Sequence, residues 1–226
     1  LVVSLELNRR AFKKHDIPKI RLEPQERRDV DRHALRIVVP LLPSAVFYHV
    51  QGVITILIVS LFGTATLMAE VGAFGRLATV LTIVGRVTGI LLFPAIARAA
   101  AGKRFVSNLL LAHAGYMLVM LALFASSVLL PQYWMLLLGD KYKDMQPLLW
   151  MVFLAFIFAN AAGFAFRTLV ARGATARQSL GIPLIIGTQL AFAAVFGVND
   201  LKTVLGFNLA STLVQCLYQY GLLAAR

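Results

Sequence analysis

The chain has 226 residues, of which 59% are hydrophobic and only 14% charged, and its mean hydropathy is +0.79. This composition excludes an ordinary soluble domain, and the length suits about six membrane spans. The formal net charge of +12 does not indicate a nucleic-acid partner, because positive charge in membrane proteins usually lies in cytoplasmic loops. We therefore expect an all-α membrane protein.

Motifs for catalysis and metal binding are absent from the sequence. No GxxxxGK[ST], HExxH or CxxC pattern occurs, and the one cysteine, Cys216, lies in an apolar run. The sequence thus predicts no ATP hydrolysis, no metal or other cofactor, and no disulfide framework. The chain has no signal peptide and its first methionine is Met68, so we expect it to be a fragment of a longer protein.

Residues 1–36 are predicted to form a basic cytoplasmic linker. They hold ten of the 22 Lys and Arg residues and six of the ten Asp and Glu residues. Leu1–Leu7 is interpreted as the end of a preceding helix or as a short interfacial segment. Pro18 and Pro24 interrupt the linker, and a helix from Gln25 leads towards the membrane. The basic residues are interpreted as a topology signal, with a phosphoinositide-type lipid patch as the alternative.

Residues 37–226 are predicted to form a bundle of six transmembrane helices. Each span is an apolar run bounded by charged or helix-breaking residues, and Pro40 and Pro43 are expected to bend the start of the first. The predicted spans are Ile37–Phe62, Gly75–Ala97, Phe105–Leu130, Pro147–Leu169, Ser179–Val198 and Val204–Ala225.

The charged residues between these spans predict one orientation. Seventeen basic residues fall on the side of the linker, including Arg98, Lys103, Arg104 and Arg226. All four acidic residues beyond the linker fall on the other side, and no span contains a carboxylate. An even number of spans with both ends of the segment cytoplasmic satisfies every loop. A catalytic acid pair or a carboxylate proton relay is accordingly not expected within the spans.

The second span carries two arginines on one helical face. Arg76, Thr79, Thr82 or Ile83, and Arg86 follow steps of three and four residues. Arg76 is placed near the start of the span and Arg86 near its middle. An arginine in the bilayer core costs between about 3 and 17 kcal/mol. We therefore expect this face to meet water, a partner or a ligand, and we expect the other helices to enclose it.

The other spans carry polar residues at helical spacing. Such residues commonly join helices in lipid, but a shared polar interior better explains the first, second and sixth spans together. His49 and His113 are interpreted as hydrogen-bonded interior residues, and Gly85 and Gly89 as a close-packing pair. The remaining stripes are Ser44, Tyr48, Gln51 and Thr55; Asn160, Gly163 and Arg167; and Asn208, Ser211, Gln215 and Gln219, with looser sets at Asn108, His113 and Tyr116, and at Thr188 and Gln189.

Two long segments resemble a known family. The first, at residues 60–98, is SLFGTATLMAEVGAFGRLATVLTIVGRVTGILLFPAIAR. The second, at residues 129–177, is LLPQYWMLLLGDKYKDMQPLLWMVFLAFIFANAAGFAFRTLVARGATAR. Both resemble bacterial polysaccharide flippases of the Wzx type, in the multidrug/oligosaccharidyl-lipid/polysaccharide exporter superfamily. The second contains the outer turn at Leu138, Gly139 and Tyr142 and the inner turn Ala171-Arg172-Gly173.

The resemblance covers most of Val38–Arg226 and implies the C-terminal half of a transporter with about twelve helices. A missing N-terminal six-helix half, or a second subunit, would supply the other wall of a cavity in the inner membrane. The implied cargo is an undecaprenyl-diphosphate-linked oligosaccharide, moved by alternating access without a covalent step. The implied cargo-binding residues are Arg86, Arg76, Arg167, Tyr48, Gln51, Tyr116, Asn208 and Gln215.

Three other functions remain open at this stage. A drug or cation antiporter of the same superfamily is disfavoured by a cationic lumen without acids, unless the absent half supplies them. A membrane assembly module that does not transport fits a six-helix chain that pairs with another subunit. A membrane glycosyltransferase or polymerase is disfavoured because large outer loops with catalytic clusters are missing.

Overall fold

The computed structural model describes residues 23–98 and 103–225. The chain forms two units, Leu1–Arg36 and Ile37–Arg226. Residues 1–22, with the predicted helix end at 1–7 and most of the predicted linker, lie outside the described residues. So do residues 99–102, the C-terminal Arg226, and the side chains of residues 87–106 and of His49. The predictions for Gly89 and His49 therefore concern side chains outside the described set.

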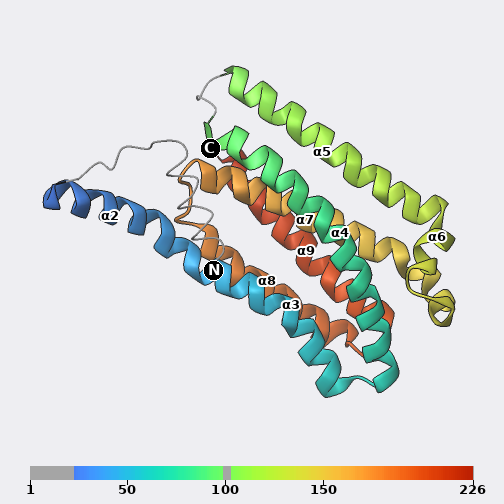
Figure 1. The fold of residues 1–226 in the computed structure, drawn as a ribbon. Helices are drawn as coiled ribbons and strands as arrows, with labels where there is room; N and C mark the ends of the chain where they lie inside the picture. Colours follow the sequence, from blue (N-terminus) through green and yellow to red (C-terminus); the bar gives the residue numbers. More distant parts are fainter. Residues whose placement is uncertain (1–22, 99–102, 226) are drawn as a thin grey trace. The chain divides into compact units, whose positions relative to one another are not determined.

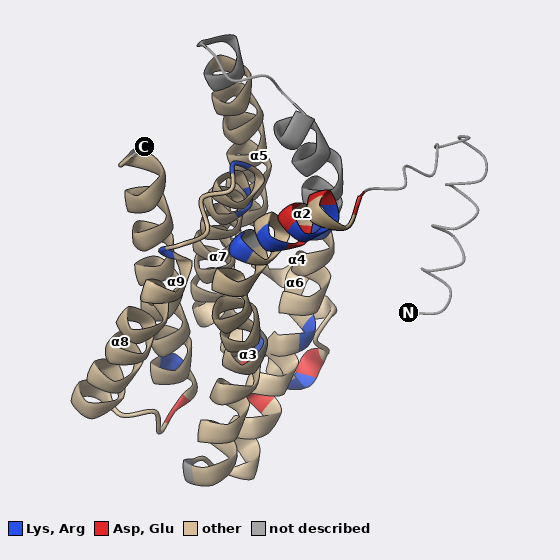
Figure 2. Ribbon diagram, turned by 90° about the vertical axis from the view of Figure 1, so that its left-hand side faces the viewer, with Lys and Arg blue, Asp and Glu red and all other residues tan. Residues whose placement is uncertain are grey.

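The described part of the first unit is helical. Helix α2 (Pro24–Val38) confirms the helix predicted from Gln25, and its residues 23–36 are all exposed. Glu26 lies in its first turn and Arg36 in its last, as favoured by the helix dipole. Blue and red residues are densest on this helix, while the long helices of the second unit are almost entirely tan (Figure 2).

All regular secondary structure among the described residues of the second unit is helical. Three of its helices, which begin at Val39, Leu42 and Pro131, have a proline at the first or second position. The amide proton that proline lacks is not needed there. In chain order the helices are η1 (Val39–Leu41), α3 (Leu42–Phe62), α4 (Ala65–Arg98), α5 (Lys103–Leu129), α6 (Pro131–Leu136), η2 (Asp140–Leu148), α7 (Leu149–Ala171), η3 (Gln178–Leu180), α8 (Gly181–Phe196) and α9 (Leu201–Ala224).

Most predicted spans coincide with a helix to within a few residues, but two boundaries differ. The predicted first span is interrupted near its start by η1, which contains Pro40. This agrees with the bend expected from the prolines. Helix α4 begins at Ala65, ten residues before the predicted start at Gly75. The prediction placed the start where the apolar run begins, whereas backbone hydrogen bonding continues through Glu70 regardless of polarity. Arg76 is consequently well inside its helix.

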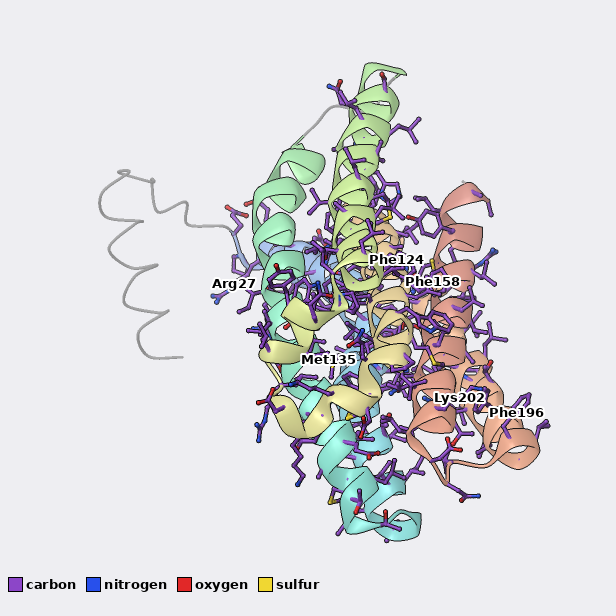
Figure 3. The ribbon with its side chains drawn as sticks, turned by 90° about the vertical axis from the view of Figure 1, so that its right-hand side faces the viewer. Arg27, Phe124, Met135, Phe158, Phe196 and Lys202 are labelled. Carbon is purple, nitrogen blue, oxygen red and sulfur yellow. The ribbon has the colours of Figure 1, made fainter. Side chains whose placement is uncertain are left out.

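Five helical segments among the described residues are long and apolar enough to cross a membrane. They are Pro24–Leu61, Ala65–Ile83, Ser107–Leu129, Asp140–Ala171 and Gln178–Phe196. Large apolar side chains cover the outside of the bundle, for example Leu111 at 74% exposure and Phe196 at 63%, which projects from the end of α8 (Figure 3). Such surfaces are stable only in contact with lipid or protein, and together with the five apolar helices they indicate a multi-pass membrane protein. Helix α9 is long enough but carries several amide side chains.

Helix α7 is the centre of the bundle. Its most apolar window is 56% buried, against 28% or less for the other four segments. Its most extensive contact is with α9, and it also packs on α5 and α4, with α4, α7 and α9 adjacent in Figure 1. Phe153, Phe156 and Phe164 of α7 are buried in the core, as are Leu77 and Leu81 of α4.

Successive long helices of the second unit alternate in direction (Figure 1). The end of α4, the start of α5, the α7–α8 turn and the end of α9 lie at one end, which we call the basic end because Arg172 and Arg177 lie in its turn. The α3–α4 and α8–α9 turns and the α6–η2 segment lie at the other, which we call the mixed end because Asp140, Asp144 and Lys143 lie there.

At the mixed end, polar side chains secure the helix starts. Asp200 accepts a hydrogen bond from the Thr203 amide at 2.7 Å in a capping box that begins α9, and this bond lowers the pKa of Asp200. Lys143 lies 2.8 Å from Asp140, and this hydrogen bond lowers the pKa of Asp140. Trp134 of α6 donates to Ser126 Oγ at 3.1 Å and packs edge-on against Phe153. The short helix α6 is thus fixed against the bundle.

Candidate functional site

The arginine face of α4 lies on the outside of the bundle. Arg76, Thr79, Thr82 and Arg86 are all exposed, and Ile83 is 59% exposed. The opposite face packs inward and consists of Ala73, Phe74, Leu77, Leu81 and Gly85. The expectation that the other helices enclose the arginine face is therefore wrong for the described residues. Both the bundle interior and lipid favour apolar side chains, so the face that packs inward was not evident from the sequence.

The two arginines lie near the middle of a long helix. A helix of 34 residues is about 51 Å long, against about 30 Å for the hydrocarbon core. Arg76 and Arg86 lie on either side of its midpoint and are about 15 Å apart along the axis. Any placement in which α4 crosses the core therefore leaves at least one of them inside it. An uncovered guanidinium there needs water, a partner or an anion.

Polar side chains of α3 and α9 approach one another at two levels. We define the polar seam as the stripes that contain these contacts, Ser44, Tyr48, Gln51 and Thr55 on α3 and Asn208, Thr212, Gln215 and Gln219 on α9. Thr55 donates a hydrogen bond to Asn208 Oδ1 at 3.0 Å. One heptad away on each antiparallel helix, the Tyr48 hydroxyl lies beside the Gln215 and Gln219 side chains. This register puts Gln51 level with Thr212 and Ser44 level with Gln219.

The seam is buried at the basic end. Ser44 and Gln219 are completely buried, and Gln219 Nε2 donates to Gln178 Oε1 at 2.9 Å. Among the described residues, no hydrogen bond is formed by the Ser44 hydroxyl, the Tyr48 hydroxyl or Gln219 Oε1. Buried polar atoms of this kind usually bind a partner or water. The seam is therefore a polar contact between helices, with donor and acceptor groups that can bind further partners.

A second polar cluster joins α5, α7 and α9, and we define it as His113, Tyr116, Asn160, Arg167 and Tyr220. The Tyr116 hydroxyl donates to Asn160 Oδ1 at 2.7 Å, and the Tyr220 hydroxyl lies 2.6 Å from His113 Nε2. The half-buried Arg167 folds back along its own helix beside Gly163 and interacts with Tyr116. Side chains on a helix point towards its N-terminus. The Arg167 guanidinium therefore points along α7, away from the basic end and towards the middle of the bundle.

The eight predicted cargo-binding residues do not form one cavity in the described residues. Arg76 and Arg86 are on the outer face of α4; Tyr48, Gln51, Asn208 and Gln215 belong to the seam; Tyr116 and Arg167 belong to the α5–α7–α9 cluster. Asn160 belongs to the polar stripe that contains Arg167, seven residues away, but is not among the predicted cargo-binding residues. Gln178 begins the three-residue helix η3, which is too short for periodicity to indicate its partner Gln219.

The arginine face of α4, the polar seam and the α5–α7–α9 cluster contain only positively charged or neutral side chains. The described acids lie in or just before α2, in the first turns of α4, or at the mixed end. In the described part of the chain, no group of three or more His, Cys, Asp or Glu side chains could hold a metal ion. Arginine, amide and hydroxyl groups of this kind bind anionic and sugar-like ligands through hydrogen bonds.

Comparisons with known proteins give no match. No family model matches the chain, and no curated protein and no solved structure shows significant similarity to it.

Proposed function

We propose that the chain is one six-helix bundle of a transporter that moves an undecaprenyl-diphosphate-linked oligosaccharide across a bacterial inner membrane. The observation that carries this proposal is the exposed Arg76–Arg86 face of α4, which any spanning placement of the helix brings into the bilayer core. A second six-helix bundle opposite this face would turn it into the wall of a polar cavity. Helix α9 is the sixth span, its amides tolerated because they face the seam.

The arginines favour an anionic cargo. The described residues place no acid on the α4 face, so an approaching diphosphate would meet two guanidinium groups without a competing carboxylate. Each guanidinium can bind phosphate oxygens bidentately, and such bonds are strong where water is scarce. The sugars would contact hydroxyl and amide groups like those of the seam, and the lipid tail would stay in the bilayer. Binding and release alternate as the two bundles rock, and no covalent step is needed.

Two alternatives predict different results. A drug or cation antiporter needs acids, which the second bundle would have to supply. An assembly module needs only a protein partner on the α4 face, so this face would be dry. Water access to the α4 face therefore separates a transport cavity from a permanent protein contact.

Cysteine accessibility measures this difference. In a Cys216→Ser background, we expect Thr79→Cys and Ile83→Cys to react with a charged, water-soluble thiosulfonate in membrane vesicles. Leu111→Cys and Leu118→Cys on α5 are matched controls, because both residues are highly exposed at 74% and 69% but face lipid in this proposal. We expect lipid-linked oligosaccharide to slow the reaction at positions 79 and 83 only. Equal reactivity on both helices, or none on α4, would contradict a water-filled cavity.

The proposed orientation has both ends of the segment in the cytoplasm. In intact cells with Cys216→Ser, we expect an impermeant maleimide to label Lys141→Cys in η2 but not Ala176→Cys in the α7–α8 turn. Both residues are exposed, so burial does not explain a difference. Permeabilised cells should label both positions. Labelling of position 176 with protection of position 141 in intact cells would reverse the topology.

A further inference from the structure

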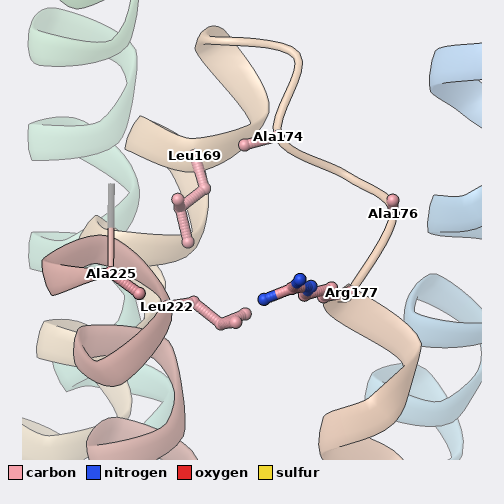
Figure 4. Close-up of a pocket in the computed structure, with 6 residues that line it drawn as sticks. All are labelled: Leu169, Ala174, Ala176, Arg177, Leu222 and Ala225. Atoms are coloured by element: carbon pink, nitrogen blue, oxygen red, sulfur yellow. The ribbon is translucent and has the colours of Figure 1, made fainter.

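A small pocket opens at the basic end of the bundle, between the α7–α8 turn and the end of α9 (Figure 4). Its volume is about 240 Å³, below the roughly 300–1,000 Å³ of pockets that enclose drug-sized ligands. It is therefore too small for an oligosaccharide but suits a single small group. Its walls are formed by Leu169, Ala174, Ala176, Arg177, Leu222 and Ala225.

The pocket combines apolar walls with one cation. Five of its six lining residues are Leu or Ala, and the Arg177 side chain extends across the opening towards Leu222 (Figure 4). Arg177 is exposed, and among the described residues no carboxylate forms an ion pair with it. A guanidinium presents five hydrogen-bond donors. The pocket therefore suits an anion attached to an apolar body.

The turn that carries Arg177 is held in place. The Tyr218 hydroxyl of α9 donates to the Arg177 carbonyl at 2.5 Å. The backbone amide of the buried Gln178 donates to the Thr175 carbonyl at 3.1 Å, and its side-chain Oε1 accepts from Gln219 Nε2. Gly173 adopts φ +68°, which favours glycine. The pocket is thus preformed by the turn and does not depend on a ligand to order it.

We propose that this pocket binds the phosphate of an anionic glycerophospholipid from the leaflet at the basic end, with Arg177 as its ligand and Leu169 and Leu222 against the glycerol and first acyl carbons. Basic pockets between membrane helices bind anionic headgroups on the cytoplasmic side, where anionic lipids attract basic residues. The basic end is also the side predicted to face the cytoplasm. This site is separate from the α4 face and does not rest on the proposed transport function.

Thermal unfolding of the full purified chain in detergent tests the site. Because a ligand that binds only the folded state raises its stability, phosphatidylglycerol should raise Tm and phosphatidylcholine should not. We expect Arg177→Gln to weaken phosphatidylglycerol binding about tenfold, the usual effect of losing one charge-assisted contact. Lys202→Gln is the matched control, because Lys202 is an exposed cation at the opposite end of α9.

A steric variant separates the pocket from general attraction of lipid to positive charge. Leu222→Trp should fill the pocket and abolish the phosphatidylglycerol effect with Arg177 unchanged. Three results would overturn the proposal: equal Tm shifts with both lipids, a lower Tm in Arg177→Gln with an unchanged lipid shift, or a full shift produced by inorganic phosphate alone. The second would mean that Arg177 only caps the end of α9, and the third that the ligand is a soluble anion.

Discussion

Replacing Arg86 with alanine should abolish export of the lipid-linked oligosaccharide while leaving the amount of protein in the membrane unchanged. Arg86 is exposed on a face that the described helices leave uncovered, so it contributes little to packing within this bundle. Its removal takes away one of the two guanidinium groups that would bind a diphosphate. A complementation assay for surface polysaccharide, run beside a membrane immunoblot, measures both quantities.

The conservative and reversing substitutions sharpen this test. Arg86→Lys should recover part of the export, because the charge remains but the bidentate fork does not, and Arg86→Glu should recover none. Ile83→Ala is a matched control on the same exposed face and should export normally. Loss of the Arg86→Ala protein from the membrane would instead indicate a structural ion pair with a second bundle. Full polysaccharide production by Arg86→Ala would falsify cargo binding at this residue.

Replacing Gly85 with alanine should destabilise the bundle. A Cβ atom at this position would collide with Asn160 Oδ1 of α7, and that oxygen already accepts the hydrogen bond from Tyr116 at 2.7 Å. The variant must displace Asn160, break this bond or separate α4 from α7. Overpacking of this kind costs about 1–3 kcal/mol, and Gly85→Leu should cost more. Thermal unfolding in detergent measures the loss.

Gly75 provides the control on the same helix. It is exposed, and a Cβ atom there meets nothing within 4 Å. Both Gly→Ala substitutions favour the helix equally, so the difference between the two variants isolates the contact with Asn160. Gly75→Ala should keep or slightly raise Tm. If Gly85→Ala and Gly75→Ala unfold at the same temperature, α4 does not pack on α7 through Gly85.

Gly85 also connects the packing of α4 to the α5–α7–α9 cluster. Tyr116 and Asn160 fix the spacing of α5 and α7, and Gly85 lets α4 approach the same point. Its neighbour Arg86 then points away from the bundle. Gly85 therefore belongs to the inward face of α4, together with Leu77 and Leu81, and the arginines lie on the opposite, outer face.

The sequence by itself determined the helices and much of their order. Apolar runs, prolines and charged turns are local signals, and they located α2, α3, α5, α7, α8 and α9 to within a few residues, apart from the η1 break. They also revealed the helical spacing of Arg76 and Arg86. They placed the start of α4 ten residues late, because the helix extends beyond the apolar run that marked it.

Only the tertiary structure decided which faces meet. Thr55 with Asn208 and Gln178 with Gln219 are pairs distant in sequence, and no local pattern specifies them. The same holds for α4: Leu77 and Leu81 pack on the bundle and the arginines do not. In a soluble protein the apolar face would have identified the interior. In a membrane protein lipid and interior are equally apolar, so the direction of Arg86 depends on which face of α4 fits its neighbours, through Leu77, Leu81 and the close approach of Gly85 to Asn160.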